Sequence, residues 1–195
     1  AQLRARTGVP ILACKEALEE SGGDEERAIE ILRKRGIAQA VKKSQREQKD
    51  GSVFLAREGG KAALVLLRCE TDFVARDAAF RSLGEELATN LLANGAAAAE
   101  ALAKEKIPAA VQNIGENVSL GDAPHAVEAP VLGTYVHSNA KIGVLVGLDR
   151  GTEEQARDAA MHAAAMAPLY VRPEDVPAEL VEREKEIWRE QLRKE

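Results

Sequence analysis

The sequence carries GSVFLAREGGKAALVLLRCET at residues 51–71 and a similar stretch, GTYVHSNAKIGVLVGLDRGT, at residues 133–152. Each copy begins with glycine and a short run of residues that favour strands. It then passes through a polar turn that ends in Lys61 or Lys141 and continues into an apolar run. The turn of the second copy is two residues shorter. The sequence therefore predicts an internal repeat of two antiparallel β-hairpins.

A helix is expected after each hairpin, from Asp72 to about Asn94 and from Glu153 to about Met166. The second strands of the two hairpins, residues 63–68 and 142–148, are apolar enough to predict strands that helices cover on one face. The repeat therefore predicts an α+β core of two ββα subdomains with antiparallel sheet.

The segment between the copies is expected to be mainly helical at first. Residues 96–104 are rich in alanine and predict a helix, Pro108 interrupts it, and a short helix follows through Val111 and Ile114. Residues 119–128 are expected to be irregular or a poor strand.

The first 36 residues predict a small bundle of three helices. The first helix ends at Thr7-Gly8, Pro10 begins the second, and Asp24 caps the third, which Gly36 is expected to end. The size and spacing of these helices resemble the ubiquitin-associated fold. Their apolar faces are expected to be formed by Ile11, Leu12, Cys14, Ala17 and Leu18 and by Ala28, Ile29, Ile31 and Leu32.

A basic stretch follows the bundle. From Arg33 to Lys49 the chain holds seven lysines or arginines and one glutamate. Nucleic-acid binding is one interpretation; a solvated, partly helical connector is the other, and the absence of an interleaved aromatic favours it. The predicted organisation is a bundle at 1–36, a basic linker at 37–50, a first core subdomain at 51–132 and a second at 133–195.

The last stretch, VPAELVEREKEIWREQLRKE, predicts a charged helix within the second subdomain. It shows no C-cap, so we expect the chain to be part of a longer protein, with a helical hairpin only begun here. The helix carries a rough apolar stripe formed by Val176, Leu180, Val181, Ile187, Trp188 and Leu192.

Composition limits the function. The 195 residues are 45% hydrophobic and 30% charged, which suits a packed domain, and the net charge of −5 gives no general attraction to nucleic acid. No apolar run approaches the roughly 20 residues that a bilayer requires, and the opening AQLRARTG shows no signal peptide. We therefore expect a cytoplasmic protein that contacts no membrane.

Neither a metal nor a cofactor is predicted. Cys14 and Cys69 are far apart in the sequence and form no CxxC pair, and the three histidines show no metal-binding spacing. Two small, buried, unbridged cysteines are the expected state in a reducing compartment.

One segment, CETDFVARDAAF at residues 69–80, is a candidate functional site. A strand ends there, and Thr71 or Asp72 caps the next helix, so Phe73 projects from the end of the sheet beside a carboxylate. An exposed aromatic beside a carboxylate is typical of an interface anchor. The residues alone leave a second interpretation open, in which the aspartate only caps the helix and Phe73 packs on Phe80 or Val74.

The chain resembles the elongation factor Ts family in four stretches, in the order of that family. They are LRARTGVPILACKEALEESGGDEERAIEILRKRG, TDFVARDAAF, IGENV, and LGTYVHSNAKIGVLV leading to AMHAAAMAPLYVRPEDVPAELVEREKE. The resemblance implies a nucleotide-exchange factor, not an enzyme, that binds elongation factor Tu in its GDP-bound and nucleotide-free forms. Asp72 and Phe73, with Thr71 and Val74, would then form the tip that disturbs the partner's Mg²⁺ and phosphate site.

The resemblance also implies further contacts with the partner. Ile114 and Gly115 match a second contact of the core, and His137 matches a histidine of the second repeat. Lys15 with Cys14 matches the contact of the bundle. The family usually has Gly-Met-Met-Asp before this Cys-Lys pair, whereas this chain has Pro-Ile-Leu-Ala.

Two other functions stay open. A binding adaptor could use the bundle to recognise ubiquitin-like or other helical partners, and it would lose all binding without residues 1–36. An RNA-binding protein could use the basic linker and would show a steep dependence on salt. The residues also leave open a homodimer or a complex with two copies of each partner.

Overall fold

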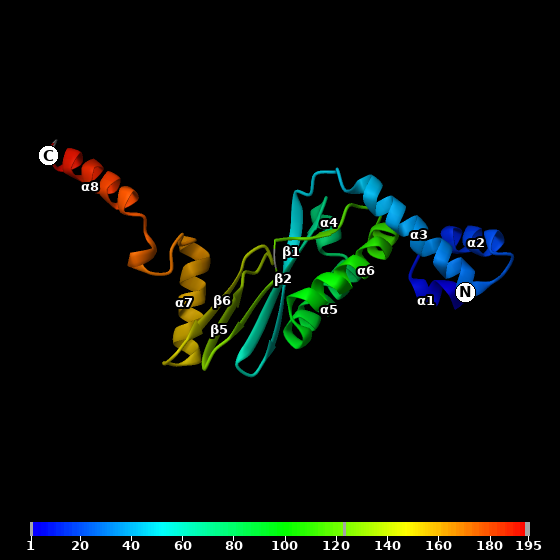
Figure 1. Cartoon of the computed structure of the whole chain (residues 1–195), viewed down its shortest axis with the longest axis horizontal. Helices are drawn as coiled ribbons and strands as arrows, with labels where there is room; N and C mark the ends of the chain where they lie inside the picture. The colour runs from blue at the N-terminus through cyan, green and yellow to red at the C-terminus, as the bar shows by residue number, and fades with distance from the viewer. Residues whose placement is uncertain (1, 123, 194–195) are drawn as a thin grey trace. The chain divides into compact units, whose positions relative to one another are not determined.

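The computed structural model describes residues 2–122 and 124–193 of the chain. These residues fall into two compact units, one up to Ala164 and the other from Ala165 onward. The first unit combines helices with antiparallel strands (Figure 1). This arrangement confirms the predicted α+β class.

Both predicted hairpins are present. Strands β1 (Asp50–Glu58) and β2 (Lys61–Cys69) pair antiparallel over their whole length. Strands β5 (Val131–Val136) and β6 (Gly143–Leu148) form the second hairpin. The alternation of strand-favouring runs and polar turns was therefore sufficient to predict both hairpins from the sequence.

Two short strands extend the first hairpin into a four-stranded sheet. Strands β3 (Ser119–Leu120) and β4 (His125–Glu128) both pair antiparallel with β2. Residues 119–128, expected to be irregular or a poor strand, thus contain two short strands that are part of the sheet. These strands are too short to show an apolar pattern of their own, and they form because β2 offers them the unpaired edge of its backbone.

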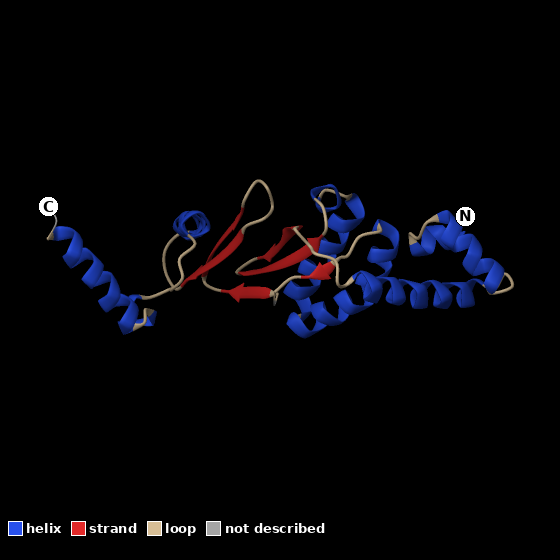
Figure 2. Ribbon diagram, turned by 90° about the horizontal axis from the view of Figure 1, so that it is seen from above, coloured by secondary structure: helices blue, strands red, loops and turns tan. Residues whose placement is uncertain are grey.

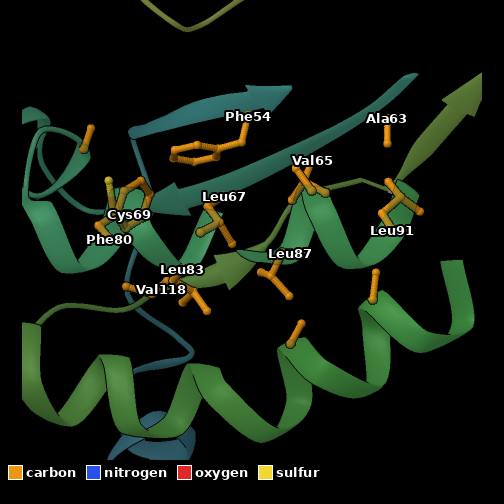
Figure 3. Close-up of a cluster of buried hydrophobic side chains, with 14 of the residues drawn as sticks. Phe54, Ala63, Val65, Leu67, Cys69, Phe80, Leu83, Leu87, Leu91 and Val118 are labelled. Atoms are coloured by element: carbon orange, nitrogen blue, oxygen red, sulfur yellow. The ribbon is translucent and has the colours of Figure 1, made fainter. Parts of the chain in front are cut away.

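Helices α5 (Ala78–Asn94) and α6 (Ala96–Ile114) cover one face of this sheet (Figure 1). Figure 3 shows the buried side chains between the strands and the two helices. Phe54 of β1 packs against Phe80 of α5, with their ring centroids 6.0 Å apart. Each large apolar side chain buried here contributes about 1.5–3 kcal/mol. The largest of those that are fully buried are Val65, Leu67, Phe80, Leu87, Leu91 and Val111.

The helix predicted from Asp72 to about Asn94 is two helices. A short helix, α4 (Asp72–Ala75), ends at Ala75 with Arg76 as its C-cap, and α5 begins after Asp77. The Asp77 carboxylate accepts hydrogen bonds from the amides of Ala79 and Phe80 at 2.8 and 3.2 Å. An aspartate that satisfies two free amides starts a new helix, and this capping interrupts the predicted one.

Pro108 lies inside α6 and does not interrupt it, contrary to the prediction. Proline removes one backbone hydrogen bond and costs about 3 kcal/mol within a helix. Ala99 and Ala103 before it and Val111 after it are all buried in the core below the sheet. Burial on both sides of the proline offsets the lost bond, so tertiary packing decides the length of this helix.

The N-terminal bundle contains α1 (Gln2–Thr7), α2 (Ile11–Glu20) and α3 (Glu25–Lys43). Its buried core includes Leu3, Val9, Cys14, Ala17, Ala28 and Leu32. Asp24 caps α3 as predicted, accepting a hydrogen bond from the Arg27 amide at 3.0 Å. Ile11 and Leu12 were expected in the core but are exposed, because the first turn of α2 faces solvent; Val9, just before this helix, is buried in the core instead.

Helix α3 does not end at Gly36 as predicted but continues to Lys43. A glycine within a helix costs about 1 kcal/mol relative to alanine. Here Gly36 is buried against α6, and a Cβ atom at this position would lie 3.0 Å from the backbone oxygen of Pro108. The glycine thus permits α3 to approach α6 closely, and the first part of the predicted linker is helical.

The second hairpin lies between the first sheet and helix α7 (Glu153–Met166), whose bounds match the prediction (Figure 2). A Cβ atom at Gly143 of β6 would lie 2.6 Å from a methyl carbon of Val53 in β1. On the other side, a Cβ atom at Gly133 of β5 would lie 2.1 Å from the backbone of Ala156 in α7. Glycines therefore permit this hairpin to contact both of its neighbours closely.

The second unit contains a 3-10 turn, η1 (Pro173–Asp175), and helix α8 (Ala178–Leu192). The predicted charged helix is thus confirmed. Its apolar side forms a shallow hollow of about 580 Å³ lined in part by Val176, Leu180, Val181, Trp188 and Leu192. The predicted domain boundaries, at 1–36, 37–50, 51–132 and 133–195, stay predictions.

Candidate functional site

The corner between β2 and α4 presents Phe73 to solvent. The Phe73 side chain is 80% exposed, although it is large and apolar. Thr71 caps α4, and its hydroxyl oxygen accepts a hydrogen bond from the Val74 amide at 3.4 Å. Phe80 is buried against Phe54 instead. Because Phe73 is 80% exposed, the interpretation that it packs on Phe80 or Val74 was wrong.

Asp72 lies directly beside this aromatic. Its carboxylate pairs with the Arg76 guanidinium at 2.9 Å, one helical turn later, and the Asp72 side chain is 47% exposed. An exposed pair of this kind contributes little to stability. The pair does orient the carboxylate, and a partner molecule could exchange it for a contact of its own.

A reciprocal pair of glutamates fastens the corner to the loop after α6. The Glu116 carboxylate accepts hydrogen bonds from the amides of Glu70 and Thr71 at 3.0 and 3.1 Å and from the Thr71 hydroxyl at 2.7 Å. In return, the Glu70 carboxylate accepts a hydrogen bond from the Asn117 amide at 2.6 Å. We refer to Glu70, Thr71, Glu116 and Asn117 as the glutamate clasp.

The clasp brings together two predicted groups of site residues, Thr71–Val74 and Ile114–Gly115. Gly115 ends α6 in the left-handed conformation, with φ of 88°, and it directs the chain towards Glu116. Ile114 is half-buried against the main core. The Lys43 ammonium donates a hydrogen bond to the Gly115 oxygen at 2.6 Å, so the end of α3 is attached to the same loop.

A cleft of about 890 Å³, lined by both apolar and polar side chains, lies beside the corner. Its lining includes Asp72 and Arg76 on one side and the turn of the second hairpin, residues 138–141, on the other. The Val53 amide donates a hydrogen bond to the Ala140 oxygen at 2.7 Å and holds this turn on β1. The second repeat therefore contributes to the same surface as the corner.

His137 precedes this turn and is exposed. Its ring Nδ1 lies 2.8 Å from the Tyr135 hydroxyl. The backbone amide of His137 donates a hydrogen bond to the Ile142 oxygen at 2.9 Å, closing the turn. The imidazole is thus held by one neighbour and keeps much of its surface open to a partner.

An ion pair joins the two hairpins at the cleft. The Lys141 ammonium lies 2.9 Å from the Asp50 carboxylate, whose side chain is only 15% exposed. Two hydrogen bonds lower the pKa of Asp50 below its ordinary value of 3.8. The larger effect comes from the Lys141 ammonium and the smaller from the Gly51 amide. The ionised carboxylate is therefore the form that the folded state favours.

Replacing Lys141 with methionine should lower the free energy of unfolding at pH 7 by about 1 kcal/mol or less. Because the folded state lowers the pKa of Asp50, this stabilisation is fully present above pH 4 and is lost as the pH falls through the folded-state pKa. The difference between the two proteins should therefore shrink at pH 3, as urea unfolding followed by circular dichroism would measure. Lys61→Met is the control, since Lys61 pairs with Glu128 where both side chains are more than half exposed. Equal losses in the two variants would contradict the argument.

The predicted residues of the bundle lie on α2. The Cys14 thiol is buried and donates a hydrogen bond to the Val9 oxygen at 3.4 Å, so it serves the packing of the bundle. The next residue, Lys15, is exposed and lies 3.6 Å from Glu19. Of this predicted pair, only the Lys15 side chain is exposed.

Several cations of the basic stretch make contacts within the chain. Arg35 pairs with Glu16 and Glu20, and Arg46 pairs with Glu70 of the clasp. These cations therefore connect elements of the fold.

Both cysteines are buried and free. Burial raises the pKa of the Cys69 thiol to about 12, so this thiol stays protonated at neutral pH. Within residues 2–122 and 124–193, no cluster of three or more His, Cys, Asp and Glu side chains could hold a metal ion. In the same ranges, no helix is both long enough and apolar enough to cross a membrane.

The sequence did not predict the structural role of Glu70, Glu116 and Asn117. Glu70 and Glu116 are 46 positions apart, and only the fold makes them neighbours. A weak signal was present, because Glu116 directly follows a glycine that ends a helix and Glu70 directly precedes a helix cap. These positions predict a contact only once the loop after β2 and the loop after α6 are known to lie side by side.

Comparison with known proteins gives a consistent result. Residues 70–195 match the family model described as Elongation factor TS. Elongation factor Ts of Idiomarina loihiensis is 43% identical over 195 residues, and that of Aeromonas hydrophila is 44% identical over 196. Elongation factor Ts of Actinobacillus pleuropneumoniae serotype 3 is 46% identical over 190 residues.

Each of these alignments covers 95% of this chain and 66% of the relative, so the chain spans just under two thirds of the length of these curated relatives. The family model covers the corner, the clasp, the second hairpin and α8. The chain therefore belongs to the elongation factor Ts family.

Proposed function

We propose that this chain acts as a guanine-nucleotide exchange factor for elongation factor Tu and promotes the release of GDP during translation elongation. The observation that carries the proposal is the exposure of Phe73 beside Asp72 on a corner that hydrogen bonds hold in place. Membership of the elongation factor Ts family supports the same partner. A translation factor of this kind works in the cytoplasm.

The proposed mechanism is one of competing binding. GDP and Mg²⁺ are held in such partners by backbone amides, a lysine and the charge of the ion. Phe73 would enter an apolar groove of the partner, and Asp72 would disturb the arrangement around Mg²⁺. A protein that binds the nucleotide-free form more tightly must weaken nucleotide binding by the same factor. No covalent bond is made or broken, so no acid, base or nucleophile is required.

The corner alone does not supply the whole effect. A decisive shift between the two forms requires about 5 kcal/mol of differential binding, whereas one buried aromatic anchor supplies about 2–4 kcal/mol. The remainder would come from other contacts, for which Lys15, Gly115 and His137 are the candidates. All three residues are exposed.

The test is the rate at which a fluorescent GDP leaves elongation factor Tu in a stopped-flow instrument. The chain at micromolar concentration should raise this rate at least tenfold, and the two proteins should co-purify until excess GDP and Mg²⁺ are added. The chain with Trp188→Ala is the control, because it loses an exposed aromatic from α8 in the second unit.

Two results would contradict the proposal. A release rate that the chain leaves unchanged would refute exchange activity. Binding that survives excess GDP and Mg²⁺ and disappears when residues 1–36 are deleted would favour the adaptor function instead.

A further inference from the structure

We propose that the glutamate clasp positions the corner for nucleotide exchange, with Glu116 as a positioning residue that acts through Thr71 on Asp72 and Phe73. The inference rests on the proposed function and adds to it a residue that makes the tip effective. Glu116 is half-buried and lies on a loop after α6, whereas the tip lies after β2.

The corner has little local support of its own. Helix α4 is only four residues long, and a single helical turn is unstable without outside contacts. The Phe73 side chain is 80% exposed, so packing does not fix it. The pair between Asp72 and Arg76 is also exposed and contributes little.

The clasp supplies the missing support from a distant part of the chain. Glu116 binds three donors of the two residues that precede α4, at 2.7 to 3.1 Å. Hydrogen bonds to a charged acceptor are stronger than those between neutral groups. Because Thr71 also caps the first turn, fixing Thr71 fixes the start of the helix that carries Asp72 and Phe73.

The reverse contact makes the arrangement mutual. The Glu70 carboxylate binds the Asn117 amide at 2.6 Å and lies 3.4 Å from Arg46. The Asn117 side chain in turn donates a hydrogen bond to the Arg46 oxygen at 2.9 Å. Hydrogen bonds therefore connect the chain before β1, the corner and the loop after α6. Removing the Glu116 carboxylate should accordingly increase the mobility of Phe73.

Positioning should affect the release step more than the encounter. A corner that is already ordered loses little conformational entropy when it enters the partner. The entropy cost that is avoided therefore stabilises the complex in which GDP is released. With Glu116→Ala, the maximal rate of GDP release at saturating concentration should fall about tenfold. The concentration that gives half of the maximal rate should change less than about twofold, because the other contacts are retained.

The experiment measures GDP release from elongation factor Tu over a range of concentrations for four proteins. They are the unsubstituted chain, Glu116→Ala, Glu116→Gln and Glu105→Ala. Glu105→Ala is the matched control, since it removes an exposed glutamate from α6 itself. Glu116→Gln keeps one acceptor oxygen, so its maximal rate of GDP release should lie between those of the unsubstituted chain and Glu116→Ala. If the alanine variant does not fold, the glutamine variant supplies the same measurement.

Two further readouts separate positioning from a general loss of stability. In the free protein, hydrogen exchange of the Glu70 and Thr71 amides should become about tenfold faster in Glu116→Ala, while the amide of Leu67 stays protected. In a chain that already carries Asp72→Ala and Phe73→Ala, the same Glu116 change should have no further effect on release, because it acts only through the tip.

The outcomes distinguish the two claims. If the unsubstituted chain does not accelerate release, the proposed function fails, and the role of the clasp in exchange fails with it. If the chain is active and Glu116→Ala behaves like Glu105→Ala, only the clasp inference is overturned. The clasp inference is also overturned if Glu116→Ala lowers the rate of GDP release equally with and without the Asp72→Ala and Phe73→Ala changes. Glu116 would then act through other residues than the tip.

Discussion

Replacing Asp72 and Phe73 together with alanine should slow GDP release from elongation factor Tu by about 30- to 1,000-fold relative to the unsubstituted chain. The range follows from the 2–4 kcal/mol that a central aromatic anchor supplies, at about 1.4 kcal/mol for each factor of ten. The Phe73 side chain is 80% exposed, and Asp72 makes only an exposed ion pair. The free energy of unfolding should therefore change by less than about 0.5 kcal/mol.

Stopped-flow release of fluorescent GDP measures the first effect, and urea unfolding measures the second. Trp188→Ala removes an aromatic of similar exposure and should leave the rate unchanged. Asp72→Asn keeps the size of the side chain and tests the charge separately from the aromatic. A double variant that is folded and releases GDP at the unsubstituted rate would refute the tip mechanism.

Replacing Gly133 with valine should lower the free energy of unfolding by about 3 kcal/mol or more. A Cβ atom at this position would lie 2.1 Å from the backbone carbon and oxygen of Ala156. Overpacking of a core usually costs about 1–3 kcal/mol when side chains can move aside. Here the obstacle is the backbone of α7, so β5 and α7 must separate and expose Leu132, Ala156 and Ala160, which are now buried.

Urea unfolding followed by circular dichroism measures this loss. Thr134→Val is the control, because it places a β-branched side chain of the same size at the next position of the same strand. The Gly133 variant should also expose the second hairpin, so hydrogen exchange should rise in β5 and β6 before it rises in β1 and β2. A Gly133→Val protein as stable as Thr134→Val would show that α7 can move without cost.

Local pattern was enough for the elements whose residues carry their own signal. The two hairpins follow from alternating strand-favouring runs and polar turns, and α7 has the predicted bounds. The exposure of Phe73 could be stated only as one of two interpretations, because it depends on whether Phe80 has another partner. Phe54, from a different strand, is that partner.

The errors occurred where distant packing overrides a local signal. Gly36 and Pro108 are both residues that usually end helices, yet both lie within helices that contact each other at these positions. The short strands β3 and β4 form only because β2 is beside them. The clasp depends on residues 46 positions apart, and no local pattern encodes such a meeting.

The unbroken helix α3 has a consequence for binding by more than one site. Because α3 runs from Glu25 to Lys43 and is attached at Gly115, the bundle is not connected to the core by a freely moving tether. The effective concentration of a second contact, once the first has formed, therefore depends on whether the spacing of the two sites on the partner matches a fixed spacing on this chain. Where the two spacings match, the second contact forms together with the first. Little further translational and rotational entropy is then lost.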